Sequence, residues 1–111
     1  IALGTNSLAT NNMVRAGAVR GATGENAVRV TVPKVDIVVG PVGIIIPNAL
    51  MGEITPAIAE AIASCDARKI LLPVKQSHFE IIGLENRPLV TIIKEAVARV
   101  CQIIDEEEGQ S

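Results

Sequence analysis

Two short aliphatic runs, separated by a capped helix, are the clearest structural pattern along the chain. Within residues 36–40 and 69–73, the three central positions are consecutively aliphatic (Ile-Val-Val and Ile-Leu-Leu), as expected for strands that are buried on both faces. Between them, Thr55 offers a side-chain oxygen at a helix N-cap and Pro56 occupies the first helical position. We therefore predict that the two runs lie in one parallel sheet and are joined by a helix that ends near Ser64.

The N-terminal third alternates strand-like and helical segments in the same way. Residues 1–3 predict the end of a buried strand, which a polar turn connects to a helix that runs to about Ala16. The glycine-containing residues 21–26 predict a loop. Residues 27–32 fit both a strand, through alternating valines, and a helical stripe. We favour a short helix, because the next parallel strand needs a crossover.

The second half of the chain contains two weaker patterns and one strong pattern. Residues 47–52, which follow three isoleucines, predict a short turn of helix. Residues 79–83 predict a strand that follows the preceding one too closely for a parallel crossover, so it pairs antiparallel or lies outside the main ladder. Residues 89–104 repeat apolar side chains at helical spacing and predict the most amphipathic helix.

These elements indicate a single α/β domain over residues 1–111, with a Rossmann-like, open and mostly parallel sheet and helices on both faces. The chain opens at Ile1 inside a strand-like segment, so we expect the first strand and helix of such a domain to be missing. The missing strand is interior in a doubly wound sheet. We therefore expect residues 1–3 to lie beside a gap that an upstream segment, another chain or a dimer mate fills, and residues 1–111 to be the larger C-terminal part of a complete domain.

Composition changes the picture mainly by excluding partners. The chain has 111 residues, of which 49% are hydrophobic, with one Phe and no Tyr or Trp, so aromatic stacking on bases is not available. The net charge of −2 leaves no basic excess for phosphate backbones, and we expect no nucleic-acid partner. The most apolar run, residues 37–46, is much shorter than the roughly 20 residues of a membrane span, so we expect no membrane partner.

The two cysteines and the single histidine form no recognisable reactive site. Cys65 and Cys101 lie in apolar helical stretches outside any Cys-x-x-Cys pair, so we expect both to be buried, unpaired, reduced and free of metal. Reduced thiols without a signal peptide favour a cytoplasmic location. His78 has no nucleophile elbow to serve, and no phosphate-loop or Gly-x-Gly-x-x-Gly pattern follows a strand, so no complete signature identifies an enzyme.

Loops that follow strands remain as the candidate ligand site, because open parallel sheets bind ligands beyond the carboxyl ends of their strands. Glycines there allow a ligand to approach the main chain closely, and polar side chains supply directional contacts. The same residues can also serve only to turn the chain and to cap helices. The candidate ligand-binding residues are Gly4, Thr5, Asn6, Thr23, Glu25, Asn26, Gly40, Gly43, Asn48 and Glu53.

Four sequence blocks, in this order along the chain, carry a family resemblance. They are residues 3–6 (Leu-Gly-Thr-Asn), 21–27 (Gly-Ala-Thr-Gly-Glu-Asn-Ala), 40–46 (Gly-Pro-Val-Gly-Ile-Ile-Ile) and 52–56 (Gly-Glu-Ile-Thr-Pro). Together they resemble an uncharacterised bacterial family, domain of unknown function 3842, over nearly the whole chain. The resemblance implies an upstream strand and a glycine-rich turn like that of dinucleotide-binding folds. It implies no reaction and no cofactor.

Two functions of different classes follow from these observations. The leading hypothesis is a cytoplasmic Rossmann-like domain that binds a small anionic ligand, such as a nucleotide, at the strand-end loops. The alternative is a non-catalytic homo-oligomeric module in which residues 44–46, Leu50 and Met51 form an apolar contact. Three consecutive isoleucines cannot all face one core in a strand, so one of them needs another neighbour.

Overall fold

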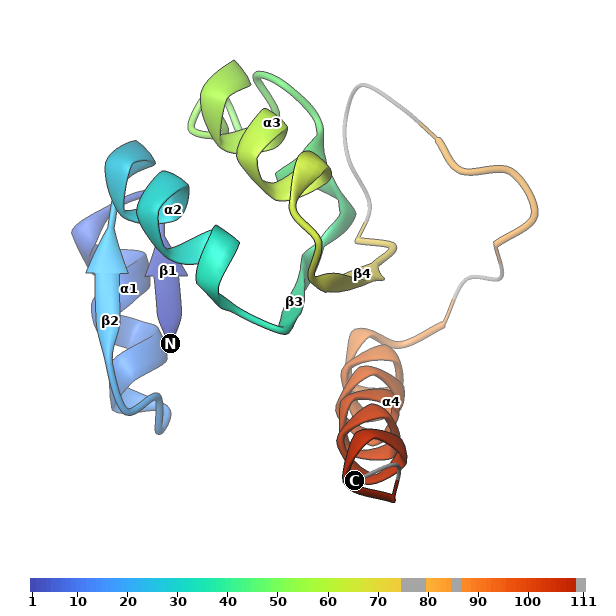
Figure 1. Cartoon of the computed structure of the whole chain (residues 1–111). Coiled ribbons are helices and arrows are strands. Elements are labelled where there is room, and N and C mark those ends of the chain that lie inside the picture. The colour runs from blue at the N-terminus through green and yellow to red at the C-terminus, as the bar shows by residue number, and fades with distance from the viewer. Residues whose placement is uncertain (75–79, 85–86, 110–111) are drawn as a thin grey trace.

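The computed structural model describes residues 1–74, 80–84 and 87–109, and strands alternate with helices along them (Figure 1). The order of elements agrees with the α/β class predicted from the sequence. The elements are β1 (Ala2–Gly4), α1 (Ser7–Arg15), β2 (Gly21–Thr23), α2 (Glu25–Thr31), the 3₁₀ helix η1 (Val32–Lys34), β3 (Ile37–Pro41), the 3₁₀ helix η2 (Val42–Ile45), α3 (Pro56–Ser64), β4 (Arg68–Leu72) and α4 (Leu89–Gly109).

The strands form two parallel pairs. β1 pairs with β2, with Leu3 opposite Ala22, and β3 pairs with β4, with Val39 opposite Ile70. The predicted parallel pairing of the two aliphatic runs is therefore confirmed, and α3 lies between them in the chain. α1 packs against β1 and β2, α2 packs against α3, and α4 contacts β4. The protein is a mixed α/β structure built on short parallel strand pairs.

α1 and α3 begin where local capping signals predict. The Oδ1 atom of Asn6 accepts a hydrogen bond of 2.9 Å from the first turn of α1, and that helix ends before Gly17, which has a φ of +125°. The Oγ1 atom of Thr55 accepts a bond of 3.2 Å from the main-chain N–H of Ile58 at the start of α3. The ambiguous residues 27–32 fall largely within α2, which confirms the short helix.

The prediction of a loop over residues 21–26 is wrong, because its first part is the strand β2. Gly21 and Thr23 are exposed, so no buried hydrophobic pattern marks the strand in the sequence. Residues 21–23 form a strand because they pair in parallel with β1. Gly21 also allows α1 to pack closely, since a Cβ atom there would lie 2.8 Å from Cγ2 of Thr10 and 2.7 Å from Cγ2 of Val14.

The three isoleucines at 44–46 also differ from the prediction. Residues 42–45 form η2, and the expected helical turn at 47–52 is a series of turns instead. Because a 3₁₀ helix turns once every three residues, successive side chains point in different directions. All three isoleucines are partly buried against the core, so none has to find a neighbour outside the chain. Gly43 is buried within η2.

The main core lies where α2 and α3 pack against each other and against the segment after η2. Its buried members are Val28, Val32, Ala49, Ile54, Ile58, Ala59 and Ile62. These side chains come from helices and turns, whereas the strands contribute partly buried residues such as Leu3 and Val38. The core therefore contacts β1 through Leu3 and β3 through Val38.

The C-terminal part departs from two predictions. Residue 79 lies outside the described residues, and residues 80–83 form no strand. Cys101 is exposed and Cys65 is half-buried, so the prediction that both are buried is wrong, although both are free thiols. α4 buries Ala96 and Ile103, and this contact turns the side of the helix that carries Cys101 outward. None of the helices in the described segments combines the length and apolar character needed to cross a membrane.

Candidate functional site

The carboxyl end of β1 presents two polar side chains, those of Thr5 and Asn6. Gly4 precedes them and is buried against α1, where a Cβ atom would lie 2.3 Å from Oγ1 of Thr10 and 2.7 Å from its main-chain nitrogen. Only glycine fits this position without displacing the helix. The close approach fixes the direction in which the chain leaves β1, and so it fixes where Thr5 and Asn6 lie.

Glu53 reaches this strand end from a distant part of the chain. Its Oε2 atom accepts a hydrogen bond of 2.8 Å from Oγ1 of Thr5, and its Oε1 atom accepts one of 3.2 Å from Nδ2 of Asn6. Glu53 closes the turns that follow η2, where Asn48 has a φ of +65° and its N–H donates to the carbonyl oxygen of Ile54 at 2.7 Å. Asn48 thus shapes the turn that brings Glu53 to Thr5 and Asn6.

A second carboxylate takes part in a neighbouring contact. Glu25, in the first turn of α2, accepts a hydrogen bond of 2.5 Å from Oγ1 of Thr55. The sequence marked Thr55 only as a helix cap, and its contact with Glu25 was missed. The position of Thr55, two residues after Glu53, was the sequence signal that could have included Thr55 among the site residues. We call Thr5, Asn6, Glu25, Glu53 and Thr55 the strand-end cluster.

The other candidate residues lie outside this cluster. The Oγ1 atom of Thr23 lies 2.8 Å from Oγ1 of the buried Thr10, so Thr23 joins β2 to α1. Asn26 is exposed in the first turn of α2. Gly40 lies in β3, where a Cβ atom would lie 3.0 Å from Cδ1 of Ile44. Gly43 is buried, which leaves it no room to meet a ligand through its main chain.

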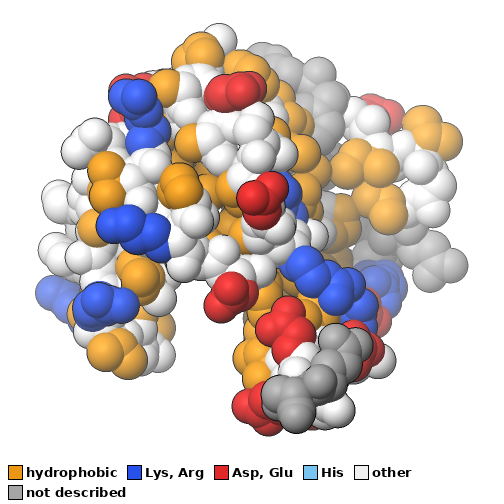
Figure 2. Space-filling model, in the orientation of Figure 1, with side chains coloured by type: hydrophobic (Ala, Val, Ile, Leu, Met, Phe, Trp, Pro, Cys, Tyr) orange, Lys and Arg blue, Asp and Glu red, His pale blue; other side chains and the backbone are white. Residues whose placement is uncertain are grey.

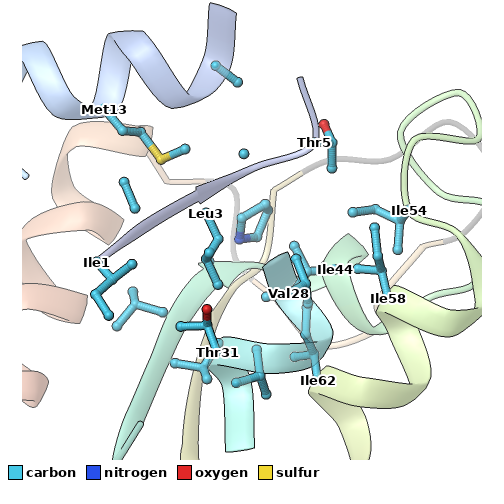
Figure 3. Close-up of a pocket in the computed structure, with 18 of the residues that line it drawn as sticks. Ile1, Leu3, Thr5, Met13, Val28, Thr31, Ile44, Ile54, Ile58 and Ile62 are labelled. Carbon is cyan, nitrogen blue, oxygen red and sulfur yellow. The ribbon is translucent and has the colours of Figure 1, made fainter. Parts of the chain in front are cut away.

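An apolar cavity of about 520 Å³ borders the strand-end cluster at Thr5 (Figure 3). Its walls come from β1, α1, α2, η1, β3, η2 and α3, and they include Gly4 and Gly40. Among the described residues that line it, the polar side chains are those of Thr5 and Thr31. The volume lies within the roughly 300–1,000 Å³ typical of ligand pockets. The site thus combines a polar, acidic rim with an aliphatic interior.

The charge of the cluster restricts what it can bind. Glu25 and Glu53 bring two carboxylates, and the hydrogen bonds of the cluster involve no Lys or Arg side chain. In the part of the chain that the structure describes, no three His, Cys, Asp or Glu side chains gather to hold a metal ion. The rim therefore suits a group that donates hydrogen bonds better than one that carries negative charge.

Among the comparisons with known proteins, a match to one protein-family model assigns the chain to a family. No curated protein and no solved structure matches it. The model of one protein family matches residues 1–105, nearly the whole chain. That match agrees with the resemblance carried by the four sequence blocks. The chain therefore belongs to the family described as Domain of unknown function (DUF3842).

Proposed function

We propose that this chain is the ligand-binding part of a Rossmann-like α/β domain, and that it holds the hydroxyl groups of a nucleoside or nucleotide at the end of β1. The observation that carries the proposal is the meeting of Glu53 with Thr5 and Asn6, 48 and 47 residues away in the sequence, at the carboxyl end of a parallel strand. Ligands of open α/β sheets bind at this edge.

The chemistry of Glu53 fits a sugar diol. A carboxylate has about four acceptor positions, and the hydrogen bonds from Thr5 and Asn6 occupy two of them. Glu53 is exposed, so the remaining positions are open to donors from a ligand. In dinucleotide-binding folds, an acidic residue that follows a strand accepts a hydrogen bond from a ribose hydroxyl in the same way.

The two carboxylates modify the expectation of an anionic ligand. A phosphate group placed against Glu25 and Glu53 would be repelled, so in a nucleotide the phosphates must lie away from the strand-end cluster. Main-chain N–H groups would then have to hold them, as at the helix N-termini of nucleotide-binding folds. The ribose, and not the phosphate, is the group that the cluster recognises.

Thermal unfolding of the chain with added ligands tests the proposal. Adenosine and ATP should raise Tm, whereas inorganic phosphate should not. A ligand at 100 times its Kd stabilises the folded state by about 2.7 kcal/mol. Glu53→Gln keeps the shape of the side chain but weakens the acceptor, and should abolish the shift. The matched control is Glu60→Gln, since Glu60 is an exposed carboxylate that accepts a bond of 2.9 Å from Ser64 on α3. A Tm shift that survives Glu53→Gln would exclude this site.

A second candidate function, self-association, is favoured by the surface of α4. Figure 2 shows α4 standing out from the rest of the molecule at the lower right, with apolar surface along one side. Val90, Ile93, Val97 and Ile104 are 63%, 44%, 59% and 41% exposed and recur at helical spacing. Light scattering of wild type and Val97→Glu tests this candidate. A dimer that Val97→Glu dissociates supports it, and a monomer at all concentrations contradicts it.

A further inference from the structure

The apolar cavity separates two strands that run in the same direction. β1 and β3 both line it, and each pairs on its other edge, β1 with β2 and β3 with β4 (Figures 1 and 3). Ile1 and Leu3 line it from the side of β1, and Ile37 and Val39 line it from the side of β3. The cavity is therefore a gap between two strand edges, with helices on either side of it.

The main chain of β1 offers hydrogen-bonding groups to this gap. The N–H of Ala2 donates to the carbonyl oxygen of Arg20 at 2.9 Å, and the carbonyl oxygen of Gly4 accepts from the N–H of Gly24 at 2.9 Å. In a parallel ladder, successive residues direct their N–H and C=O groups to opposite edges. Because Ala2 and Gly4 bond toward β2, the N–H and C=O groups of Leu3 point to the gap.

β3 does the same from the other side. The carbonyl oxygen of Asp36 accepts from the N–H of Arg68 at 3.0 Å, and the register pairs Val39 with Ile70. Asp36, Val38 and Gly40 therefore bond toward β4, and the alternate residues Ile37 and Val39 direct their main-chain groups to the gap. Val39 is 49% exposed, although β3 pairs with β4 along its other edge.

We propose that an extended aliphatic polypeptide segment from outside residues 1–111 inserts into this gap as a parallel strand. The sheet order becomes β2, β1, inserted segment, β3, β4, which is the order of a doubly wound nucleotide-binding sheet. The inference stands independently of the ligand proposed above, because it uses the strand edges and not the strand-end cluster. It is a case of strand addition, in which main-chain bonds supply affinity and the pockets select the side chains.

The chemistry of the walls selects this occupant. Groups that repeat at every second residue on both sides of the gap require a main chain between them. A small apolar molecule would fill the volume and leave the N–H and C=O groups of Leu3 and Val39 buried without partners, which is unfavourable. Met13 of α1 lines one side of the gap, and Val28 and Ile58 of the main core line the other. Side chains on both faces of the inserted strand should therefore be aliphatic.

Hydrogen exchange with a defined probe tests the proposal. The probe is a blocked peptide of alternating isoleucine and valine, five residues long, with lysines at both ends for solubility. Its binding should slow exchange of the N–H groups of Leu3 and Val39 at least tenfold. The N–H groups of Ala2 and Val38 already bond to β2 and β4, so their exchange should change much less. The same peptide with a central proline should bind at least tenfold more weakly.

A pair of proline variants provides the matched control. Val39→Pro removes an N–H group that faces the gap, whereas Leu71→Pro removes one on the outer edge of β4, and neither interrupts the ladder between β3 and β4. Circular dichroism should show that both variants fold. Val39→Pro should weaken peptide binding at least tenfold, and Leu71→Pro should not.

Four results would overturn the inference. The first is that the peptide does not bind, and the second is that it protects the amides of Ala2, Leu3, Val38 and Val39 equally. The third is that decanoate displaces the peptide while the amides of Leu3 and Val39 stay protected from exchange. The fourth is that dimerisation of the chain protects the amides of Leu3 and Val39 when no peptide is present. The third result would identify a small apolar ligand, and the fourth would identify a second copy of the chain. Hydrogen exchange of the wild-type chain with the peptide tests the strand-insertion proposal even if a proline variant fails to fold.

Discussion

The hydroxyl group of Thr10 joins α1 to β2 and to the N-cap residue Asn6, and its removal is the most direct test of the packing beneath the site. Thr10 is 6% exposed. Its Oγ1 atom lies 2.8 Å from Oγ1 of Thr23, 3.2 Å from the carbonyl oxygen of Asn6 and 3.3 Å from that of Ala22. Thr10→Val keeps the shape of the side chain and removes only these polar contacts.

The expected cost follows from counting protons. A threonine hydroxyl has one proton, so Thr10 donates to one of its neighbours at a time and can accept from Thr23. Two hydrogen bonds are therefore the most that the variant loses at once, each worth about 0.5–1.5 kcal/mol. Thr23 is exposed and can bond to water instead, so we expect Thr10→Val to lower the free energy of unfolding by roughly 1–2 kcal/mol.

Urea unfolding followed by far-ultraviolet circular dichroism measures this cost, because the chain has no Trp or Tyr for fluorescence. Thr10→Val should lower the midpoint without changing the denaturant slope. Thr23→Val and the double variant complete a cycle, whose coupling free energy should be about 1 kcal/mol. Additive effects, or a loss below about 0.3 kcal/mol in Thr10→Val, would show that the two hydroxyls do not interact.

Three further predictions concern single side chains. Gly4→Ala places a Cβ atom 2.7 Å from the main chain of α1 and should destabilise the fold by about 3 kcal/mol in urea unfolding, whereas the same change at the last residue of α4 should have little effect. The exposed thiol of Cys101 should react with a disulfide reagent almost as fast as in the unfolded chain, and Cys65 should react more slowly; equal rates would contradict this. The hydrogen bond from Arg87 lowers the pKa of Glu95 in the folded state. The contribution of this ion pair to folding stability is therefore present above the pKa that Glu95 has in the unfolded state, and it is lost as the pH falls through the pKa of the folded state. An NMR titration of Glu95 that gives the same midpoint in wild type and Arg87→Gln would refute this prediction.

The sequence by itself determined the features that depend on neighbouring residues. The caps at Asn6 and Thr55 were predictable because a side-chain oxygen satisfies amides only a few residues away. β3 and β4 were predictable because consecutive aliphatic residues favour strands of a parallel sheet, but the expected burial on both faces was wrong, since their side chains are at most partly buried. α4 was predictable from its apolar periodicity, although that pattern could not show how much of its surface a partner element covers.

Only the tertiary structure decided the features that depend on distant partners. β2 has no hydrophobic pattern, and it is a strand because β1 offers it a ladder. Glu53 meets Thr5 only because the left-handed residues near Asn48 turn the chain back, and no local spacing encodes that distance. Cys101 is exposed because α4 packs through Ala96 and Ile103, a choice among several similar apolar stripes. Local signals act over a few residues and can be read along the chain, whereas pairing, exposure and the assembly of a site depend on contacts that exist only once the chain has folded.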